Sequence, residues 1–391
     1  MGRWEQSKCF EKDDAVLLDS LSDVKKELKK KMKKKSGYLL PCLSENDKQY
    51  IDLIREQTKQ LNQNNVTRTQ AYLQFYLQYP EIHWALLGHM VSRNVGWNMT
   101  DLKGELLTKL LPERDQKAFF SFLERGSWLI FQDVYPQFSV YDLSVRGSKE
   151  MFHLLPFFYT STFMETMWRY FWRSGDSYTL AIAMVINEQS YLEKGLIQNH
   201  HFKKNVTGTV SFKMYEFLRL NNILFPYYEG EKAEKASLVG ATSRHFTSLH
   251  ERILFGKNLY SILFQREEIL ARVLKWAHEC PHTGSRKDYW PDLFNDVNES
   301  LPRSLYKRRV KNCLLRKGAK RLYSPSLKYA WPNTPHEDTK SRDWFEDWRV
   351  LDYIYKEASF NGEILNNYCK TLETIELAVM AKEALLLREE E

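Results

Sequence analysis

Apolar residues recur along most of this chain at spacings of three and four, which is the period of a helix with one buried face. The clearest case is residues 15–35, whose apolar stripe consists of Leu17, Leu21, Val24, Leu28 and Met32. Lysines fill the other side of this stretch, and Ser36-Gly37 ends it. The pattern predicts a basic amphipathic helix that lies on a membrane surface or docks on a partner. A solvated helix packed loosely on the body is the alternative.

Residues that commonly cap helix N-termini predict where the next two helices begin. Ser44 is a suitable N-cap for a helix over residues 44–61, with Asp47 three residues on. Thr67 can cap a helix over residues 68–79.

Pro80 then opens a further helix, because a proline in the first helical turn gives up no hydrogen bond. This helix is expected to reach Asn94 and to end at Val95-Gly96. Thr100 can cap a separate helix that runs to Leu111.

Helical periodicity continues to the C-terminus. It covers residues 115–125, 157–173, 178–194, 211–222, 243–279, 303–317, 343–358 and 362–389. Strand-like stretches are confined to 128–131 and 206–212, and loops rich in Pro, Gly and Asn are expected at 135–148, 226–240, 281–292 and 324–339. The sequence therefore predicts an all-α fold: one large irregular helical bundle, in which residues 1–43 form a variable basic extension and 44–391 the helical core domain.

The composition is that of a globular protein with a bulky aromatic core. Of the 391 residues, 43% are hydrophobic, 27% are charged and 14% are aromatic. No apolar run approaches about 18 residues, so no transmembrane segment is expected, and the first residues lack the apolar stretch of a secretory signal. The five cysteines are scattered and form no C-x-x-C pair. This predicts reduced thiols in a cytoplasmic protein.

The net charge of +7 is distributed unevenly. Residues 25–35 carry eight lysines against one glutamate, and residues 300–336 carry ten Lys or Arg and no acid. The rest of the chain is therefore acidic overall. Two concentrated basic segments in an acidic body favour an anionic partner.

The second basic segment interleaves its cations with Tyr306, Tyr323, Tyr329 and Trp331, so that phosphates could be neutralised and unpaired bases stacked. No helix-turn-helix, zinc-finger or RNA-recognition signature accompanies it. Nucleic acid is favoured over an anionic membrane surface as the partner, and a solvated basic helix, anchored by Leu305, Val310, Leu314 and Leu315, is the alternative. The candidate contact residues are Lys29, Lys30, Lys31, Lys33, Lys34, Lys35, Lys307, Arg308, Arg309, Lys311, Arg316, Lys317, Lys320 and Arg321.

Charged residues also occupy helix faces that should be buried within residues 65–104. Arg68 shares a face with aromatic residues, and an arginine there must be paired or stacked. A second hypothesis is therefore an enzyme, or a site for a small anionic ligand, built from Arg68, Glu81, His83, His89, Arg93 and Asp101. The alternative is an ion-pair network that fixes helix register. Glu81 and Asp101 are the carboxylates nearest in sequence to the two arginines.

The motifs of metal and nucleotide chemistry are missing. His278, Cys280 and His282 alternate in one loop without a fourth ligand, and Glu150-x-x-His153 has no second copy. P-loop, dinucleotide-binding, nucleophile-elbow and H-E-x-x-H patterns do not occur. No metal or cofactor is therefore expected, and a non-enzymatic protein that docks through residues 25–35 and 303–328 is the leading hypothesis.

The block NVTRTQAYLQFYLQYPEIHWALLGHMVSRNVGWNMTDLKG, residues 65–104, resembles a family of uncharacterised bacterial proteins from spore-forming Gram-positive bacteria, typified by YppC. The resemblance continues toward the C-terminus, whereas residues 1–45 look like a variable extension. It implies a bacterial cytosolic protein and supplies no activity, cofactor or catalytic residue.

Overall fold

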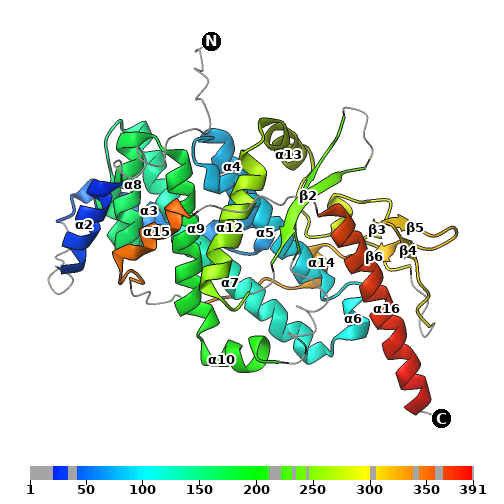
Figure 1. Ribbon diagram of the computed structural model, residues 1–391. Coiled ribbons are helices and arrows are strands. Elements are labelled where there is room, and N and C mark those ends of the chain that lie inside the picture. Colours follow the sequence, from blue (N-terminus) through cyan, green and yellow to red (C-terminus); the bar gives the residue numbers. More distant parts are fainter. Residues whose placement is uncertain are drawn as a thin grey trace.

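The computed structural model describes residues 21–33, 42–209, 211, 222–230, 235–243, 246–299, 305–337, 343–356 and 364–389. Helices dominate these segments, as the sequence predicts (Figure 1). None of the described helices combines the length and apolar character needed to cross a membrane.

The longer helices are α2 (Ser22–Lys33), α3 (Glu45–Leu61), α4 (Asn65–Gln78), α5 (His83–Asp101), α7 (Glu113–Arg146), α8 (Thr162–Ser174), α9 (Ser177–Leu192), α12 (Leu249–Phe264), α13 (Glu267–Glu279) and α16 (Leu365–Glu389). The shorter helical turns are α6 (Leu107–Leu110), η1 (Phe152–Phe158), η2 (Glu193–Ile197), α10 (His200–Phe202), η3 (Lys203–Thr207), η4 (Arg286–Asp288), α14 (Leu327–Ala330), η5 (Trp348–Leu351) and α15 (Asp352–Tyr355).

Helix α5 lies at the centre of the bundle and contacts α4, α7, α9 and α12. It is buried on most sides, with Trp84 and Trp97 almost fully enclosed. The aromatic residues of α4 fill the space between α5 and α7: Phe75 stacks on Phe138 with a 4.2 Å separation of ring centroids. Aromatic residues of this kind form the core between these helices.

The predicted N-terminal helices are confirmed with small shifts. Within the described part of the predicted stripe, Leu21, Val24 and Leu28 are at most 1% exposed and Met32 is half-buried, while Leu17 lies outside the described residues. Helix α2 packs on α8. Ser44 caps α3 and forms the expected capping box with Asp47. The cap of α4 is not Thr67, because the helix begins three residues earlier than predicted, behind Asn64.

Two predicted helix breaks are wrong. Helix α5 passes through Gly96 and continues to Asp101, so there is no separate helix from Thr100 to Leu111. Gly96 serves close packing here: a Cβ would overlap Asn65 and His282, whose side chains meet above it. In the same way α7 runs through Pro136 and includes both the predicted strand 128–131 and most of the predicted loop 135–148.

The expectation of no regular strands also needs correction. Strands β1 (Asn222–Tyr227) and β2 (Ser237–Thr242) form an antiparallel hairpin that includes most of the predicted loop 226–240. Most residues of β1 are buried, so its sequence does not alternate between apolar and polar residues. It also contains Pro226, a residue that argues against a strand. For these two reasons the sequence did not predict β1. Two further pairs are only two residues long: β3 (Phe294–Asn295) with β6 (Leu322–Tyr323), and β4 (Val310–Lys311) with β5 (Leu314–Leu315).

Candidate functional site

The polar residues of the 65–104 block do not meet at one site. Arg68 pairs with Glu124 of α7 at 2.6 Å, with side-chain exposures of 1% and 3%. Its guanidinium also donates to Asn62 at 3.2 Å. The partner of Arg68 is therefore neither Glu81 nor Asp101, but a carboxylate from a helix 56 residues further on.

Glu81 and His83 bond to different helices. The hydroxyl of Tyr141 donates to Glu81 at 2.7 Å, and His83 Nδ1 lies 2.8 Å from the hydroxyl of Tyr260. Burial lowers the pKa of His83 to about 4. This imidazole is neutral at physiological pH and acts as a hydrogen-bonding group between α5 and α12.

His89 and Arg93 share a second buried cluster. His89 Nδ1 lies 2.8 Å from the Thr69 carbonyl, and burial lowers the pKa of His89 well below its usual value. Arg93 stacks on the indole of Trp276 at 4.4 Å and donates to the carbonyl of Cys280. Burial lowers the pKa of Arg93 to about 10, so this guanidinium stays charged at neutral pH.

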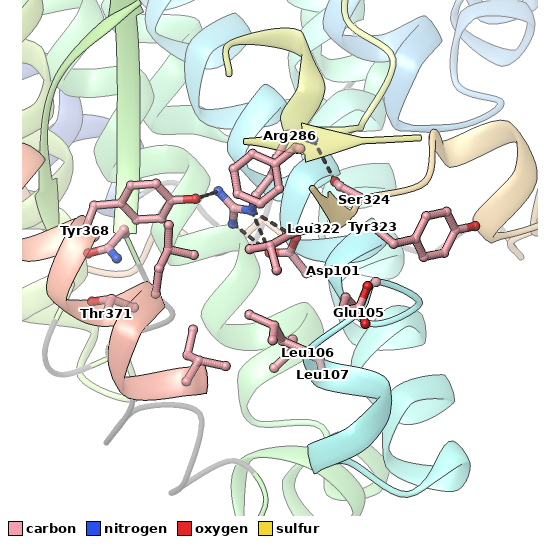
Figure 2. A pocket seen from close by; sticks show the side chains of 15 residues that line it. Asp101, Glu105, Leu106, Leu107, Arg286, Leu322, Tyr323, Ser324, Tyr368 and Thr371 are labelled. Atoms are coloured by element: carbon pink, nitrogen blue, oxygen red, sulfur yellow. Dashed lines mark hydrogen bonds and ion pairs between the residues drawn. The ribbon is translucent and has the colours of Figure 1, made fainter. Parts of the chain in front are cut away.

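Asp101 forms part of a third cluster, around Arg286, which Figure 2 shows. The guanidinium of Arg286 donates to both oxygens of Asp101 at 2.7–2.9 Å, and also to the hydroxyls of Tyr289 and Tyr368 at 2.9 and 3.0 Å. The adjoining pocket has a volume of about 40 Å³. That is room for a water molecule or two, so the cluster ties α5 to α16 and leaves no space for a substrate.

The first basic segment, on α2, is partly neutralised by its neighbours. Lys25 and Lys29 place their ammonium groups 4.1 and 4.4 Å from the ring centroid of Trp348, and Lys31 pairs with Glu165 at 3.3 Å. Of the other candidate lysines, Lys30 and Lys33 are exposed. Lys34 and Lys35 lie outside the described residues.

The second basic segment is not the predicted helix over 303–317. Residues 305–323 form an extended stretch in which β4 and β5 make a hairpin. Its two-residue turn is Asn312-Cys313, with φ values of +52° and +57°. Asparagine is one of the residues that adopts this left-handed turn most readily, and it is the local signal that the helical reading overlooked. Of the four predicted anchors, Leu305 and Leu314 are 56% and 60% exposed and anchor nothing, whereas Val310 is fully buried and Leu315 packs on the core.

An acidic face of α16 holds this segment in place. Glu376 is fully buried and accepts hydrogen bonds from the backbone N–H groups of Arg309 and Val310 at 2.7 and 3.0 Å. Glu373 pairs with Arg308. Glu373, Glu376 and Glu383 are spaced by three and seven residues, which places them on one helical face.

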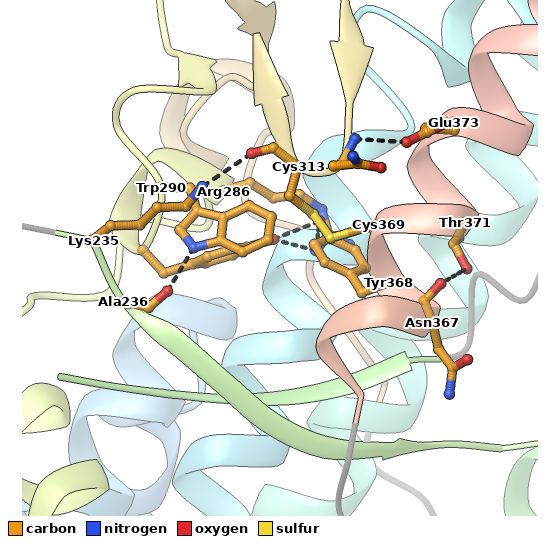
Figure 3. Close-up of a disulfide and its surroundings, with 12 residues drawn as sticks. Lys235, Ala236, Arg286, Trp290, Cys313, Asn367, Tyr368, Cys369, Thr371 and Glu373 are labelled. Carbon is orange, nitrogen blue, oxygen red and sulfur yellow. Dashed lines mark hydrogen bonds between the residues drawn. A yellow bond between two sulfur atoms is a disulfide. The ribbon is translucent and has the colours of Figure 1, made fainter. Parts of the chain in front are cut away.

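A disulfide fixes the tip of the hairpin to the same helix. Cys313 is bonded to Cys369 of α16 (Figure 3). The ammonium of Lys235 donates to the Cys313 carbonyl at 3.0 Å. The expectation of reduced thiols is therefore wrong for these two cysteines. Scattered spacing hid the pair, because they are 56 residues apart in sequence. Cys42 and Cys280 are free thiols.

The cations of this segment fall into two sets. Arg309 pairs with Glu105 at 3.1 Å and Arg321 lies 3.6 Å from Glu299, while Lys320 donates to the Glu299 carbonyl at 2.5 Å. The exposed set has no ion-pair partner within the described ranges and consists of Lys307, Lys311, Arg316 and Lys317. Tyr329, 81% exposed, follows on α14. We call the four exposed cations the hairpin cations.

The alternating His278, Cys280 and His282 do not form a metal site. His282 Nε2 bonds to Asn65 Oδ1 at 2.8 Å, and the Cys280 thiol lies 3.5 Å from the Tyr228 hydroxyl. Over the segments that the structure covers, no three His, Cys, Asp or Glu side chains are grouped to hold a metal ion.

Comparison with known proteins assigns the chain to a family. The family model described as "Protein of unknown function (DUF2515)" matches residues 60–367. The chain belongs to this family. It is also 43% identical over 238 residues to the uncharacterized protein YppC of Bacillus subtilis, which covers 61% of this chain and 72% of YppC. No solved structure matches.

The region matched to the DUF2515 family spans the buried polar clusters and the hairpin cations, and ends two residues before Cys369. Three of the side chains that organise the basic segment, Glu373, Glu376 and Glu383, lie beyond it on α16. Sequence reasoning missed them because it treated the basic segment as an isolated helix. Their common face on a long C-terminal helix was the available signal.

Proposed function

We propose that this protein docks on an anionic partner through the hairpin cations, with nucleic acid favoured over a membrane surface. The observation that carries the proposal is the contrast within one segment. Arg308 pairs with Glu373 of α16, and Arg309 pairs with Glu105, which lies just before α6. The hairpin cations, in contrast, extend into solvent. Because the disulfide and Glu376 hold the hairpin backbone in advance, binding of phosphates need not order that backbone.

Nucleic acid is favoured because of what accompanies the cations. Arg316 can contact a phosphate with two donors, and the exposed ring of Tyr329 offers a surface for stacking on a base. Membrane-surface elements instead carry several large apolar residues beside their cations. The hairpin exposes Leu314 alone among its strand and turn residues.

The α2 lysines are a secondary element of this proposal. Figure 1 shows α2 and the β4–β5 hairpin at opposite ends of the molecule. A short ligand therefore cannot contact both, and the hairpin alone must supply the measurable binding. A cytoplasmic location follows from the proposal as an expectation, in a compartment where disulfides such as Cys313–Cys369 are rare.

The test is fluorescence anisotropy of labelled duplex and single-stranded DNA, titrated with the protein at several salt concentrations. Four phosphate contacts predict that log affinity falls against log salt with a slope of about −3 to −4. Lys311→Gln/Lys317→Gln should make that slope shallower by about 2.

The matched control is Lys117→Gln/Lys275→Gln, which removes two exposed lysines that are paired within their own helices. It should leave affinity and slope unchanged. Absence of binding at low salt, or an equal loss in both double variants, would refute docking on nucleic acid through the hairpin. Binding to phosphatidylserine vesicles in place of DNA, lost in the hairpin variant alone, would identify the membrane surface as the partner.

A further inference from the structure

A second site, separate from the hairpin, lies between α3 and α7. It is a cavity of about 1100 Å³ lined by these two helices, η1 and residues 333–336. Its size is slightly above the usual range of about 300–1000 Å³ for small-molecule sites. Aromatic and proline side chains make up much of its wall: Trp128, Pro136, Phe157, Phe158, Tyr159 and Tyr191.

The spacing along α7 builds one side of this cavity. Trp128, Gln132 and Pro136 are four residues apart and therefore share a face. Pro136 lacks an N–H, so the Gln132 carbonyl one turn earlier loses its helical donor. A hydrogen-bond acceptor is thus released beside the cavity.

Asp133 is the buried charged group of the wall, whereas the charged lining residues of α3, Asp52, Arg55, Glu56 and Lys59, are exposed. It is 6% exposed, and its Oδ2 accepts hydrogen bonds from Asn187 at 2.6 Å and Gln137 at 3.0 Å. Yet no cation of the described segments forms an ion pair with it. The contrast is Glu124, two and a half turns earlier on α7, which is paired with Arg68.

His336 lines the same cavity and carries an unsatisfied polar atom. Its side chain is 9% exposed and packs on Trp128, with ring centroids 5.3 Å apart. Its Nε2 has no hydrogen-bond partner among the described atoms and lies 3.6 Å from Glu124 Oε1. This nitrogen is buried and faces Glu124, so His336 contributes the edge of its ring to the cavity wall.

We propose that this cavity binds a small primary amine, whose ammonium group pairs with Asp133 and donates to the Gln132 carbonyl while its carbon chain lies against Phe158 and Tyr191. A buried carboxylate that forms no ion pair within the described segments, beside a carbonyl that lacks its usual helical donor, is complementary to an N–H-bearing cation. The apolar wall is complementary to a hydrocarbon body.

Other occupants fit less well. The cations of the wall, Arg55 and Lys59, lie on its exposed side, so an anion at the buried end would face Asp133. A divalent metal ion there would need more oxygen ligands than one buried carboxylate supplies. Glu124 and Asp133 are nine residues apart, about 13 Å along the helix axis. Two carboxyls that act on one bond lie within about 10 Å of each other, so the pair does not form a hydrolytic centre.

The protonation of Asp133 agrees with this assignment. Burial raises the pKa of its carboxyl to about 7. Close to neutral pH an incoming ammonium would therefore displace a proton from a substantial fraction of the molecules.

The experiment measures binding of pentylamine to the full chain by isothermal titration calorimetry and by the shift in melting temperature, at constant ionic strength. Pentan-1-ol has the same chain without the charge, and tetramethylammonium has the charge without N–H donors. Saturable binding of pentylamine, at least about tenfold tighter than either, is expected.

Asp133→Asn should weaken pentylamine binding at least about tenfold. The control is Asp52→Asn, the same chemical change on the rim of the same cavity, where the side chain is 79% exposed. It should change binding less than about twofold, since exposed pairs contribute little. Equal effects of the two variants would overturn the assignment, as would equal binding of amine and alcohol.

A measurement on the unmodified protein keeps the test decisive if Asp133→Asn fails to fold. Calorimetry at pH 6.5 in two buffers of different ionisation enthalpy reports the protons released per amine bound. A release of roughly half a proton or more is expected from a carboxyl with this pKa. Binding without proton release would contradict the role of Asp133. DNA binding by the hairpin is unaffected by any of these outcomes, because it involves none of these residues.

Discussion

The buried pair Arg68–Glu124 and the basic segment 305–323 look alike in sequence, since both show cations with no nearby acid, but their structures differ. Arg68 and Glu124 are sealed between α4 and α7, and each has the other as its ionic partner. In the basic segment, α16, Glu105 and Glu299 neutralise some cations and leave the hairpin cations in solvent. The comparison teaches that a basic run is informative only once its distant acids are located.

The largest effect is expected from breaking the buried pair. Glu124→Ala leaves the Arg68 guanidinium charged and enclosed, which should reduce the free energy of unfolding by about 3–5 kcal/mol. Chemical denaturation measures this. The double change Arg68→Met/Glu124→Leu should recover much of the loss, because a hydrophobic replacement leaves no lone charge. A double variant as unstable as the single one would show that the cost is a packing defect.

The second-largest loss of stability is expected from removal of the Cys313–Cys369 disulfide, which holds the basic segment. Cys313→Ser/Cys369→Ser opens a loop with a sequence separation of 56, so the free energy of unfolding should fall by up to about 4 kcal/mol. Denaturation with and without reductant measures the difference. Cys42→Ser, at an exposed free thiol, is the control and should change nothing.

The free energy of unfolding should depend on pH through Asp133, which, unlike Glu124 on the same helix, is not in an ion pair among the described residues. The folded pKa of Asp133 is about 7, above its ordinary value of 3.8. The unfolded chain therefore loses this proton first, so stability should fall as the pH rises from about 4 to 7 and stay low above that range. The full difference is roughly 1–4 kcal/mol.

Asp133→Asn should make this decline smaller, which thermal unfolding at pH 5 and pH 8 will detect. The groups around the carboxyl are Asn187, Gln137, Asp343, Glu188 and Tyr72. Burial raises the pKa of Glu188 to about 7 as well, so the wild type and the variant must be compared at each pH. An identical slope in both proteins would assign the decline to Glu188.

The smallest effect belongs to the hairpin cations. Neutralising all four with glutamine should change the free energy of unfolding by less than about 0.5 kcal/mol, because exposed unpaired cations stabilise little. Arg309→Gln, by contrast, should cost about 1–3 kcal/mol, since it removes an ion-pair partner of the buried Glu105. Equal losses in the two variants would mean that the hairpin cations are structural.

Local signals predicted much of the fold. The stripe of α2, the capping box at Ser44 and the long α16 follow from spacing and side-chain chemistry within a few residues. Most of the failures concern distant partners, although the turn at Asn312 and the cap at Asn64 were local signals that the interpretation overlooked. Gly96 and Pro136 are helix breakers by propensity, and tertiary packing overrides that preference in both cases. The ion pairs could not be predicted from the sequence either, because partners such as Glu105 and Arg309 are 204 residues apart.

The candidate sites show the same limit. Burial of residues 68 and 93 could be expected from their helix faces, but not that Arg68 and Arg93 enter different clusters. Asp133 and His336 gave no signal in sequence, since a single carboxylate in a helix and a single histidine in a loop are ordinary residues. Only the fold brings them to one cavity.

The Cys313–Cys369 bond also determines how damage to the chain would be seen. If a protease cut one peptide bond anywhere between residues 314 and 368, the two pieces would remain covalently joined through this bond. Electrophoresis without reductant would show an intact species, and only reduction would release the C-terminal fragment that carries α16. The integrity of a preparation of this protein should therefore be judged under reducing conditions.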